Sequence, residues 1–333
     1  MFKKATLMFL YTETSLHAGS GTSLGVVDLP IQREKYTDFP VIQASGIKGA
    51  VREWFESEPI TNVSARKIEL AFGPDKIGSE ESGFAAAVTF TDVRILLFPV
   101  RSLKGIFAYC TSPTVLQRFR RDAQIAGVPL DWTVPSPPND RTVLGVQNGS
   151  DVAAGDQVLL EEYAFGFQAN ADVTEIAEWL SQEAFPNGAE YEFWREKVKK
   201  SLLVLPDNAF RDFVKLSTEV QARIKIDNDK RTVVKGGLFY EEALLPDSLL
   251  YSVILAHDPV KDDRTELADA AAVLTFLRGI DGKRLQLGGD ATIGRGIVSV
   301  RFCGQEKQPE SQKEGQSGRT VWPTSPPLLT GHR

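Results

Sequence analysis

Residues 16–53 read LHAGSGTSLGVVDLPIQREKYTDFPVIQASGIKGAVRE and combine a histidine, a Gly/Ser-rich loop, an aspartate and a Lys-Gly helix start. A second Gly-rich segment, residues 285–301, reads LQLGGDATIGRGIVSVR and runs into a predicted strand. Such turns let a backbone approach a ligand closely and present N–H groups to it. The first segment has Leu24 where a third glycine would complete a dinucleotide-binding motif, and no P-loop Lys-Ser/Thr pair follows it. The two segments therefore predict a binding site of a different kind.

The composition is that of a globular protein with a substantial core. The chain has 333 residues, of which 42% are hydrophobic and 25% are charged. No apolar run reaches the roughly 18 residues of a membrane helix, so we expect no membrane span. Two cysteines, Cys110 and Cys303, suit a reducing cytoplasm. The three histidines are too scattered for a zinc site of the usual spacing.

The charge distribution is uneven. A net charge of −6 disfavours indiscriminate binding of nucleic acid, because an acidic surface repels phosphate. Residues 101–121 and 223–235 are nevertheless locally basic. These stretches are either solvated faces balanced by acids elsewhere or part of a groove for a nucleic-acid backbone, and the sequence leaves both interpretations open.

The hydrophobic periodicity predicts an α+β fold with an RRM-like or ferredoxin-like core rather than a doubly wound parallel sheet. Residues 128–157 are rich in Pro, Gly, Asn and Asp and predict a loop or a weakly ordered insertion. From residue 304 the periodicity ends, which predicts a disordered tail. Strands are expected at 6–12, 84–100, 106–111, 249–256 and 297–302, and helices at 45–56 with Ser45 as N-cap, 65–71, from 113, 173–185, 190–204, 207–216 and 265–278.

Residues 220–241 predict a β-hairpin with its turn at Asn228-Asp229. The alternation in RIKID, residues 223–227, gives the first strand one apolar and one charged face. We expect this hairpin to project from the body of the protein.

Six motifs follow one another along the chain: LHAGSG at 16–21, VDLPIQRE at 27–34, SGIKG at 45–49, DVRILLFPVRS at 92–102, GLFYEE at 237–242 and GGDATIGRG at 288–296. Together they resemble the RAMP superfamily of CRISPR-Cas proteins, and more closely the repeated backbone subunit of type III-B (Cmr) effector complexes. The resemblance covers roughly residues 1–303, as a single domain. The DLPIQR and LFPVRS runs are specific to this subunit type. One departure is QASG at 43–46, where the family has Pro-Gly-Ser-Ser, so the role of that turn's hydroxyl is open.

The resemblance implies an RRM-like palm with an inserted helical region and a protruding hairpin thumb over residues 220–241. Copies of such a subunit stack along a CRISPR RNA beside other Cmr-type subunits, and each thumb displaces one guide–target base pair. Complementary target RNA is then cut at regular intervals, beside an acidic residue on the loop between the first strand and the first helix.

Asp28 is the candidate catalytic acid on that loop. A single carboxylate on a loop can bind a divalent metal ion, here Mg²⁺ or Mn²⁺, or organise an attacking 2′-hydroxyl. The competing interpretation is a solvated or loop-capping aspartate. His17 is the second catalytic candidate, as a proton shuttle or a contact to RNA, although it can equally hydrogen-bond its own Gly-rich turn.

The candidate RNA-binding residues lie in the first turns of a predicted helix, at the end of a strand, on the basic side of the predicted hairpin and in the second Gly-rich segment. They are Lys48, Arg52, Arg101, Ser102, Arg223, Lys225, Gly288, Gly289 and Arg295. Asp92 and the pair Glu241/Glu242 are candidate secondary acids, with a salt bridge to a nearby Arg or Lys as the alternative. Arg52 has the same alternative, with Glu53 or Glu56.

The favoured hypothesis is therefore a cytoplasmic, CRISPR RNA-binding backbone subunit and metal-assisted endoribonuclease. One rival is a scaffold of the same fold without cleavage activity. Another is a nuclease that processes precursor CRISPR RNA, a class that usually relies on a His/Tyr/Lys set without metal. A metabolic enzyme is disfavoured because no nucleophile or cofactor motif is recognisable.

Overall fold

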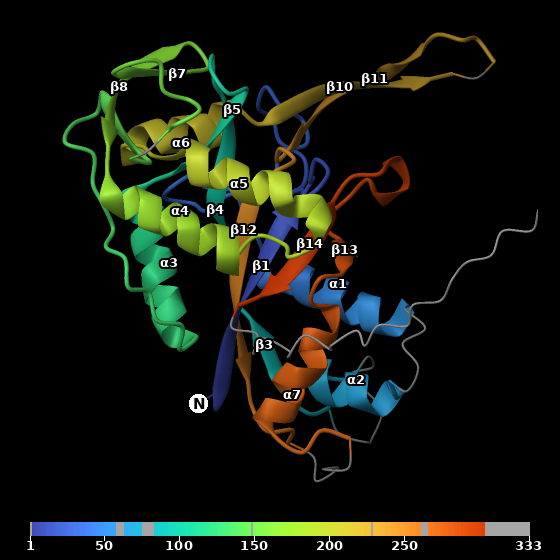
Figure 1. Ribbon diagram of the computed structural model, residues 1–333. Coiled ribbons are helices and arrows are strands. Elements are labelled where there is room, and N and C mark those ends of the chain that lie inside the picture. Colours follow the sequence, from blue (N-terminus) through green and yellow to red (C-terminus); the bar gives the residue numbers. More distant parts are fainter. Residues whose placement is uncertain are drawn as a thin grey trace, which may run out of the picture.

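A twelve-stranded mixed sheet organises the chain (Figure 1). The computed structural model describes residues 2–57, 63–74, 83–147, 149–227, 229–260 and 266–303. The strands follow the order β13-β14-β1-β12-β4-β5-β9-β6-β8-β7, with β2 paired to β4 and β3 to β12. They are β1 (Lys4–Thr12), β2 (Val41–Ile42), β3 (Val88–Phe90), β4 (Val93–Arg101), β5 (Phe107–Thr111), β6 (Thr142–Gly145), β7 (Gln157–Leu160), β8 (Tyr163–Ala169), β9 (Leu202–Val204), β12 (Leu249–Ala256), β13 (Arg284–Gln286) and β14 (Ile297–Phe302).

Helices cover both faces of the sheet. They are α1 (Ala44–Ser57), α2 (Ala65–Phe72), α3 (Pro113–Ile125), α4 (Ala171–Glu183), α5 (Glu192–Ser201), α6 (Asp207–Leu216) and α7 (Ala270–Leu277), with short 3-10 turns η1 (Ala189–Tyr191), η2 (Arg278–Ile280) and η3 (Ala291–Ile293). Figure 1 shows α1, α2 and α7 together on one side and α3, α4 and α5 on the other. Within the described ranges, none of the helices has the length and apolar character needed to cross a bilayer.

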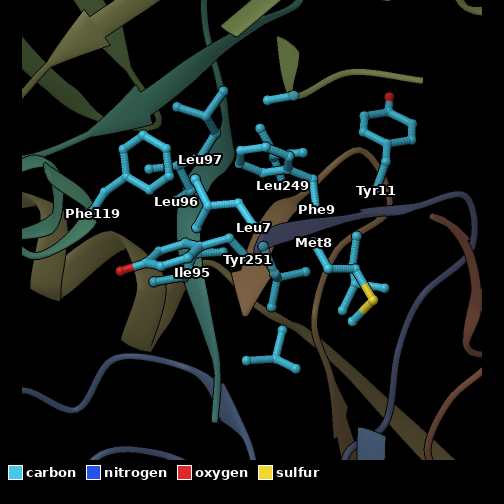
Figure 2. Close-up of a cluster of buried hydrophobic side chains, with 14 of the residues drawn as sticks. Leu7, Met8, Phe9, Tyr11, Ile95, Leu96, Leu97, Phe119, Leu249 and Tyr251 are labelled. Atoms are coloured by element: carbon cyan, nitrogen blue, oxygen red, sulfur yellow. The ribbon is translucent and has the colours of Figure 1, made fainter. Parts of the chain in front are cut away.

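The central strands are buried along almost their whole length because both faces are covered. On one face, Phe119 of α3 packs against Phe9, Trp179 and Tyr251, with ring centroids 5.0 to 5.9 Å away. Figure 2 shows Phe119 beside side chains of β1, β4 and β12. The other face has its own aromatic contacts, among them Phe55 of α1 against Phe276 of α7 at 4.2 Å. The α+β class is confirmed.

The predicted hairpin is present and forms a sheet of its own. Strands β10 (Glu219–Ile226) and β11 (Val233–Ala243) form a two-stranded sheet that extends away from the body in Figure 1, and β11 makes a further bridge, from Glu241 to Leu29. Asn228 of the predicted turn lies outside the described residues. The predicted apolar face is exposed; its large side chains are Val220, Ile224, Ile226, Val233, Leu238 and Tyr240.

Three sequence predictions need correction. The helix expected at 190–204 ends at Ser201, and Leu202–Val204 form β9, because three consecutive apolar residues are buried between β5 and β6. The expected loop at 128–157 contains strand β6, which pairs in parallel with β8. The helix expected from residue 265 begins only at Ala270, where the Asp269 side chain accepts a hydrogen bond from Ala272 N.

The start of α1 also differs from the prediction. Ser45 lies inside the helix and is not its N-cap, because α1 begins at Ala44. The first turn is capped instead from a distant segment, since Asp92 Oδ1 accepts a 2.8 Å hydrogen bond from Ala44 N. The tail predicted from residue 304 lies outside the described residues, and the single-domain boundary at 303 stays a prediction.

Truncation of the aromatic cluster should test the core. Phe119 is fully buried, so Phe119→Ala should lower the free energy of unfolding by about 3–5 kcal/mol through lost burial and a residual cavity. Leu103→Ala is the control, because Leu103 is 78% exposed and its truncation should change stability by no more than about 0.5 kcal/mol. Denaturant unfolding measures both, and equal losses would contradict the assigned core.

Candidate functional site

The two Gly-rich segments of the sequence meet at His17. Gly289 N donates a 2.9 Å hydrogen bond to His17 O, and Gly296 N donates one of 2.9 Å to Ser15 O. A Cβ at Gly288 would lie 2.3 Å from His17 O, and one at Gly19 would lie 2.7 Å from the His17 ring. The glycines are therefore explained by close packing of the two segments on each other, and contact of Gly288 and Gly289 with RNA stays a prediction.

His17 is 9% exposed and has a defined tautomer. Its Nδ1 lies 2.6 Å from the backbone oxygen of Glu242, which only accepts, so Nδ1 carries the proton and donates. Its Nε2 faces Glu241 Oε1 at 3.8 Å. The sequence left open whether His17 acts in chemistry or holds its own loop, and these contacts favour a role in holding the loop.

Asp28 lies on a loop that pairs with the base of the hairpin. Leu29 forms a parallel bridge with Glu241, through Leu29 N to Tyr240 O at 3.0 Å and Glu242 N to Leu29 O at 3.0 Å. Tyr240 N also donates a 2.7 Å hydrogen bond to Asp28 Oδ2. Among the described residues Asp28 Oδ1 has no hydrogen-bond partner. One oxygen of the carboxylate is thus held by the hairpin, and the residue as a whole is half-exposed.

A network of buried and half-buried charges, centred on Glu241 and Arg295, lies at the base of the hairpin. Glu241 Oε2 is 2.6 Å from Arg223 Nε and 3.2 Å from Arg295 Nη1, although the Arg223 Nε–H does not point at that oxygen. Asp290 Oδ2 is 2.6 Å from Arg223 Nη2 and 3.6 Å from Arg295 Nη1. Glu219 Oε1 lies 3.9 Å from Arg295 Nη2. For Glu241 this geometry supports the salt-bridge interpretation.

This network gives two of the predicted RNA-binding arginines intramolecular partners. Arg295 is 6% exposed, and its guanidinium also donates to Gln221 Oε1 at 2.6 Å. Lys225, by contrast, is exposed on the hairpin and has no ion pair among the described residues. Direct contact of Arg223 and Arg295 with RNA stays a prediction, whereas Lys225 is accessible to a phosphate.

Helix α1 carries a half-buried cation near its start. Burial lowers the pKa of Lys48, and repulsion from Arg52 lowers it further. No carboxylate within the described ranges forms an ion pair with Lys48. Arg52 Nε donates to Glu56 Oε1 at 2.8 Å, which is one of the alternatives that the sequence left open. A phosphate beside Lys48 would supply the missing negative charge.

The remaining candidates lie at two separate places. Arg101, at the end of β4, has an exposed side chain that donates to Glu161 Oε2 at 3.0 Å. Ser102 is buried, and its hydroxyl has no partner within the structure. Asp92 caps α1, as described above, so its carboxylate already has a structural role.

The sequence did not identify the residues that anchor the Asp28 loop through the Glu242 carboxylate. Arg33 and Thr218 both donate to the Glu242 carboxylate, at 2.5 Å and 2.7 Å. Arg33 lies in the same DLPIQR run as Asp28, so the run itself was a usable signal. Thr218 gave none, because the pairing that brings it to Glu242 joins residues 24 positions apart.

The fold and the site together define the class. The model of the RAMP superfamily matches residues 9–299, and the chain belongs to this superfamily. Within it, the chain is 41% identical over 298 residues to the CRISPR system Cmr endoribonuclease Cmr4 of Pyrococcus furiosus, with 89% of this chain and 95% of that protein covered. It is 28% identical over 310 residues to the CMR subunit Cmr4 of Saccharolobus solfataricus, with coverages of 88% and 95%.

Solved structures agree with this assignment. A crystal structure of oligomeric Cmr4 from Pyrococcus furiosus superposes with a TM-score of 0.67 at 33% identity, covering 90% of this chain and 98% of that chain. A chain in a cryo-EM structure of the type III-B Cmr-β complex bound to cognate target RNA gives a TM-score of 0.66 at 24% identity, with coverages of 90% and 98%. The comparison with this second structure, at 24% identity, shows a shared fold.

Alanine at Gly288 should disturb the contact with His17. Gly288→Ala combines a left-handed backbone, with φ of +76°, and a Cβ only 2.3 Å from His17 O. Gly294→Ala is the matched control, since φ is +81° but no atom lies within 4 Å of the added carbon. The control should lose about 1–2 kcal/mol of stability, and Gly288→Ala a further 1–3 kcal/mol. Equal losses in denaturant unfolding would contradict the close approach.

Proposed function

We propose that this chain is a backbone subunit of a type III-B CRISPR effector complex that binds CRISPR RNA and cuts complementary target RNA. The relative with 41% identity is named an endoribonuclease, and a solved neighbour is described as oligomeric. The observation that carries the proposal is the half-exposed Asp28 carboxylate, held on a loop against the base of the projecting hairpin.

The parts of the fold receive roles in this proposal. The antiparallel strands β4, β12, β1 and β14 with α1 and α7 form the RRM-like palm, α4 to α6 belong to the inserted region, and β10–β11 is the thumb. Lys48 and Lys225 are exposed or half-buried cations without ion pairs inside the described part of the chain, so they are available for backbone phosphates. Further copies of the chain and other Cmr-type subunits complete the assembly. We also propose a cytoplasmic location, supported by two free cysteines.

Asp28 would act on the ribose of the cut nucleotide. In internal cleavage the 2′-hydroxyl loses its proton, its oxygen attacks the adjacent phosphorus, and the bond to the 5′-oxygen breaks. The departing 5′-oxygen takes up a proton from water. Because Tyr240 N holds Oδ2, Oδ1 is the Asp28 atom left to align that hydroxyl or accept its proton. His17, with its proton fixed at Nδ1, would support the loop that presents Asp28. Guide–target pairing supplies the remaining geometry.

A divalent cation fits the site at Asp28 only together with a ligand from the RNA. Among the described residues no group of three His, Cys, Asp or Glu side chains converges to hold a metal by protein ligands alone. Mg²⁺ commonly binds through one or two carboxylates together with substrate phosphates, so Asp28 and an RNA phosphate would hold Mg²⁺ or Mn²⁺ jointly. The ion would neutralise charge that develops on the phosphate.

Asp28→Asn should separate cleavage from binding. The substitution keeps the size of the side chain and an acceptor for Tyr240 N, but removes the charge. Assembly with guide RNA and target binding should persist, while cleavage of a labelled complementary RNA should fall at least about a hundredfold. Cleavage by the unaltered complex should also cease on chelation and return with Mg²⁺ or Mn²⁺.

His17→Ala serves as the comparison for this variant. Because His17 acts through the loop, we expect only a partial loss of cleavage with some loss of RNA affinity. Full activity of the Asp28→Asn complex would remove Asp28 from the mechanism and favour the scaffold hypothesis or another acid. Full activity in the presence of chelator would remove the metal.

Lys48→Ala should weaken RNA binding without changing its sequence dependence. Loss of one phosphate contact should reduce the slope of log affinity against log salt concentration by about 1. Lys199→Ala is the control, because Lys199 already forms an ion pair with Glu196 on α5. Binding of single-stranded RNA, followed by fluorescence anisotropy at several salt concentrations, measures both slopes. An unchanged slope for Lys48→Ala would exclude the contact.

A further inference from the structure

Glu242 follows Glu241 in β11 and points to the opposite side of the strand, as successive side chains do. Its side chain is only 7% exposed. Oε1 accepts hydrogen bonds from Arg33 Nη2 at 2.5 Å and Thr218 Oγ1 at 2.7 Å. Oε2 accepts one from Ile31 N at 3.1 Å. Both oxygens of this carboxylate are therefore used inside the protein.

The backbone of Glu242 reaches the two candidate catalytic residues. Its N–H donates to Leu29 O at 3.0 Å, next to Asp28 in the chain. Its carbonyl oxygen accepts the 2.6 Å hydrogen bond from His17 Nδ1. One residue thus contacts the segment that carries Asp28, the ring of His17 and, through Thr218, the start of the hairpin.

Arg33, which donates to the Glu242 carboxylate, connects Glu242 to the body of the protein. Its Nη1 donates to Asp38 O at 2.7 Å and to Val214 O, in α6, at 2.9 Å. The loop that precedes Ile31 is exposed at its tip, where Leu24 and Val26 face solvent. The Asp28 side chain is held directly by Tyr240 N, and the segment that follows it is anchored at the buried Glu242 carboxylate through Ile31 N.

We propose that Glu242 is a positioning residue that keeps the hairpin, the Asp28 loop and His17 in fixed positions relative to one another. Where the hairpin crosses the guide–target duplex then determines which phosphate Asp28 meets. This inference rests on the proposed function. Glu242 acts through Asp28 and His17, since its carboxylate is buried and fully hydrogen-bonded, and it takes no part in proton transfer.

Glu242→Gln is the informative variant. Glutamine keeps the size of the side chain, but one of its two ends is an amide NH₂ group. In either orientation that group meets a donor, at Ile31 N or at Arg33 and Thr218, and the Arg33 charge loses its partner. The position of the Asp28 loop relative to the hairpin should therefore become less well defined, while the surface that meets RNA is unchanged.

The experiment maps the ends of the products at nucleotide resolution and measures the single-turnover rate, using complexes assembled with guide RNA. For Glu242→Gln we expect unchanged target affinity, a rate lowered by about ten- to a hundredfold, and cuts spread to neighbouring phosphates. Unaltered cut positions together with an unaltered rate would overturn the inference.

Asp122→Asn is the matched control for loss of a buried, ion-paired carboxylate. Asp122 lies in α3, is 5% exposed and accepts from Arg94 Nη1 at 2.7 Å and Tyr251 OH at 3.0 Å. Among the described residues it makes no direct hydrogen bond or ion pair with residues 16–33 or 240–242. The Asp122→Asn substitution should lower thermal stability but leave the cut positions unchanged. If the cuts spread to neighbouring phosphates in both variants, general destabilisation would be the cause, and the inference would be overturned.

Thr218→Val decides the question if Glu242→Gln fails to assemble. It removes one hydrogen bond to Glu242 Oε1, and we expect a roughly three- to tenfold lower rate with the same spreading of cuts. A wild-type pattern would overturn the inference. If the unaltered complex itself leaves complementary RNA intact, the proposed function fails, and that outcome is distinct from a failure of the positioning role.

Discussion

Backbone pairing along the end of β11 is the constraint on which the site depends. Leu16 and Leu244 exchange two hydrogen bonds, of 2.9 and 2.8 Å, and Leu29 pairs with residues 240 and 242 a few positions earlier. A slip of one residue would exchange the two sides of the strand. Glu241 would then leave its arginines and Glu242 would leave Arg33, so the buried charges and the backbone ladder specify the same register.

The buried charges explain why a basic residue in the hairpin need not be a contact to RNA. Removing arginine and carboxylate groups from water carries a large desolvation cost, which is offset only when every member is paired. Arg223 and Arg295 share Glu241 and Asp290 in this way. Withdrawing either arginine to bind a phosphate would leave the other alone to compensate the buried Glu241 carboxylate and Asp290. Contacts to RNA therefore fall more naturally to cations without such partners, such as Lys48 and Lys225.

The sequence predicted the features that depend on local pattern. Alternation in residues 223–227 was sufficient for the hairpin, and the two Gly-rich segments marked the site that His17 occupies. Features that depend on distant pairing were missed. Strand β9 is only three residues long and follows a helix without a break, so only its position between β5 and β6 defines it. The cap of α1 likewise comes from Asp92, far along the chain.

The hairpin itself is a two-stranded ribbon with an exposed apolar face, and such a ribbon is marginally stable alone in water. The ion pairs at its base and the Asp28 loop beside β11 give it support at one end only. Its outer half exposes Ile224, Ile226, Val233 and Leu238, a composition suited to burial against another surface. Asp28 is hydrogen-bonded to the same strand, through Tyr240 N, that carries Leu238 and Tyr240 of this face. The pairing of Leu29 with β11 and the Tyr240–Asp28 hydrogen bond therefore join the ribbon and the loop that carries the carboxylate directly.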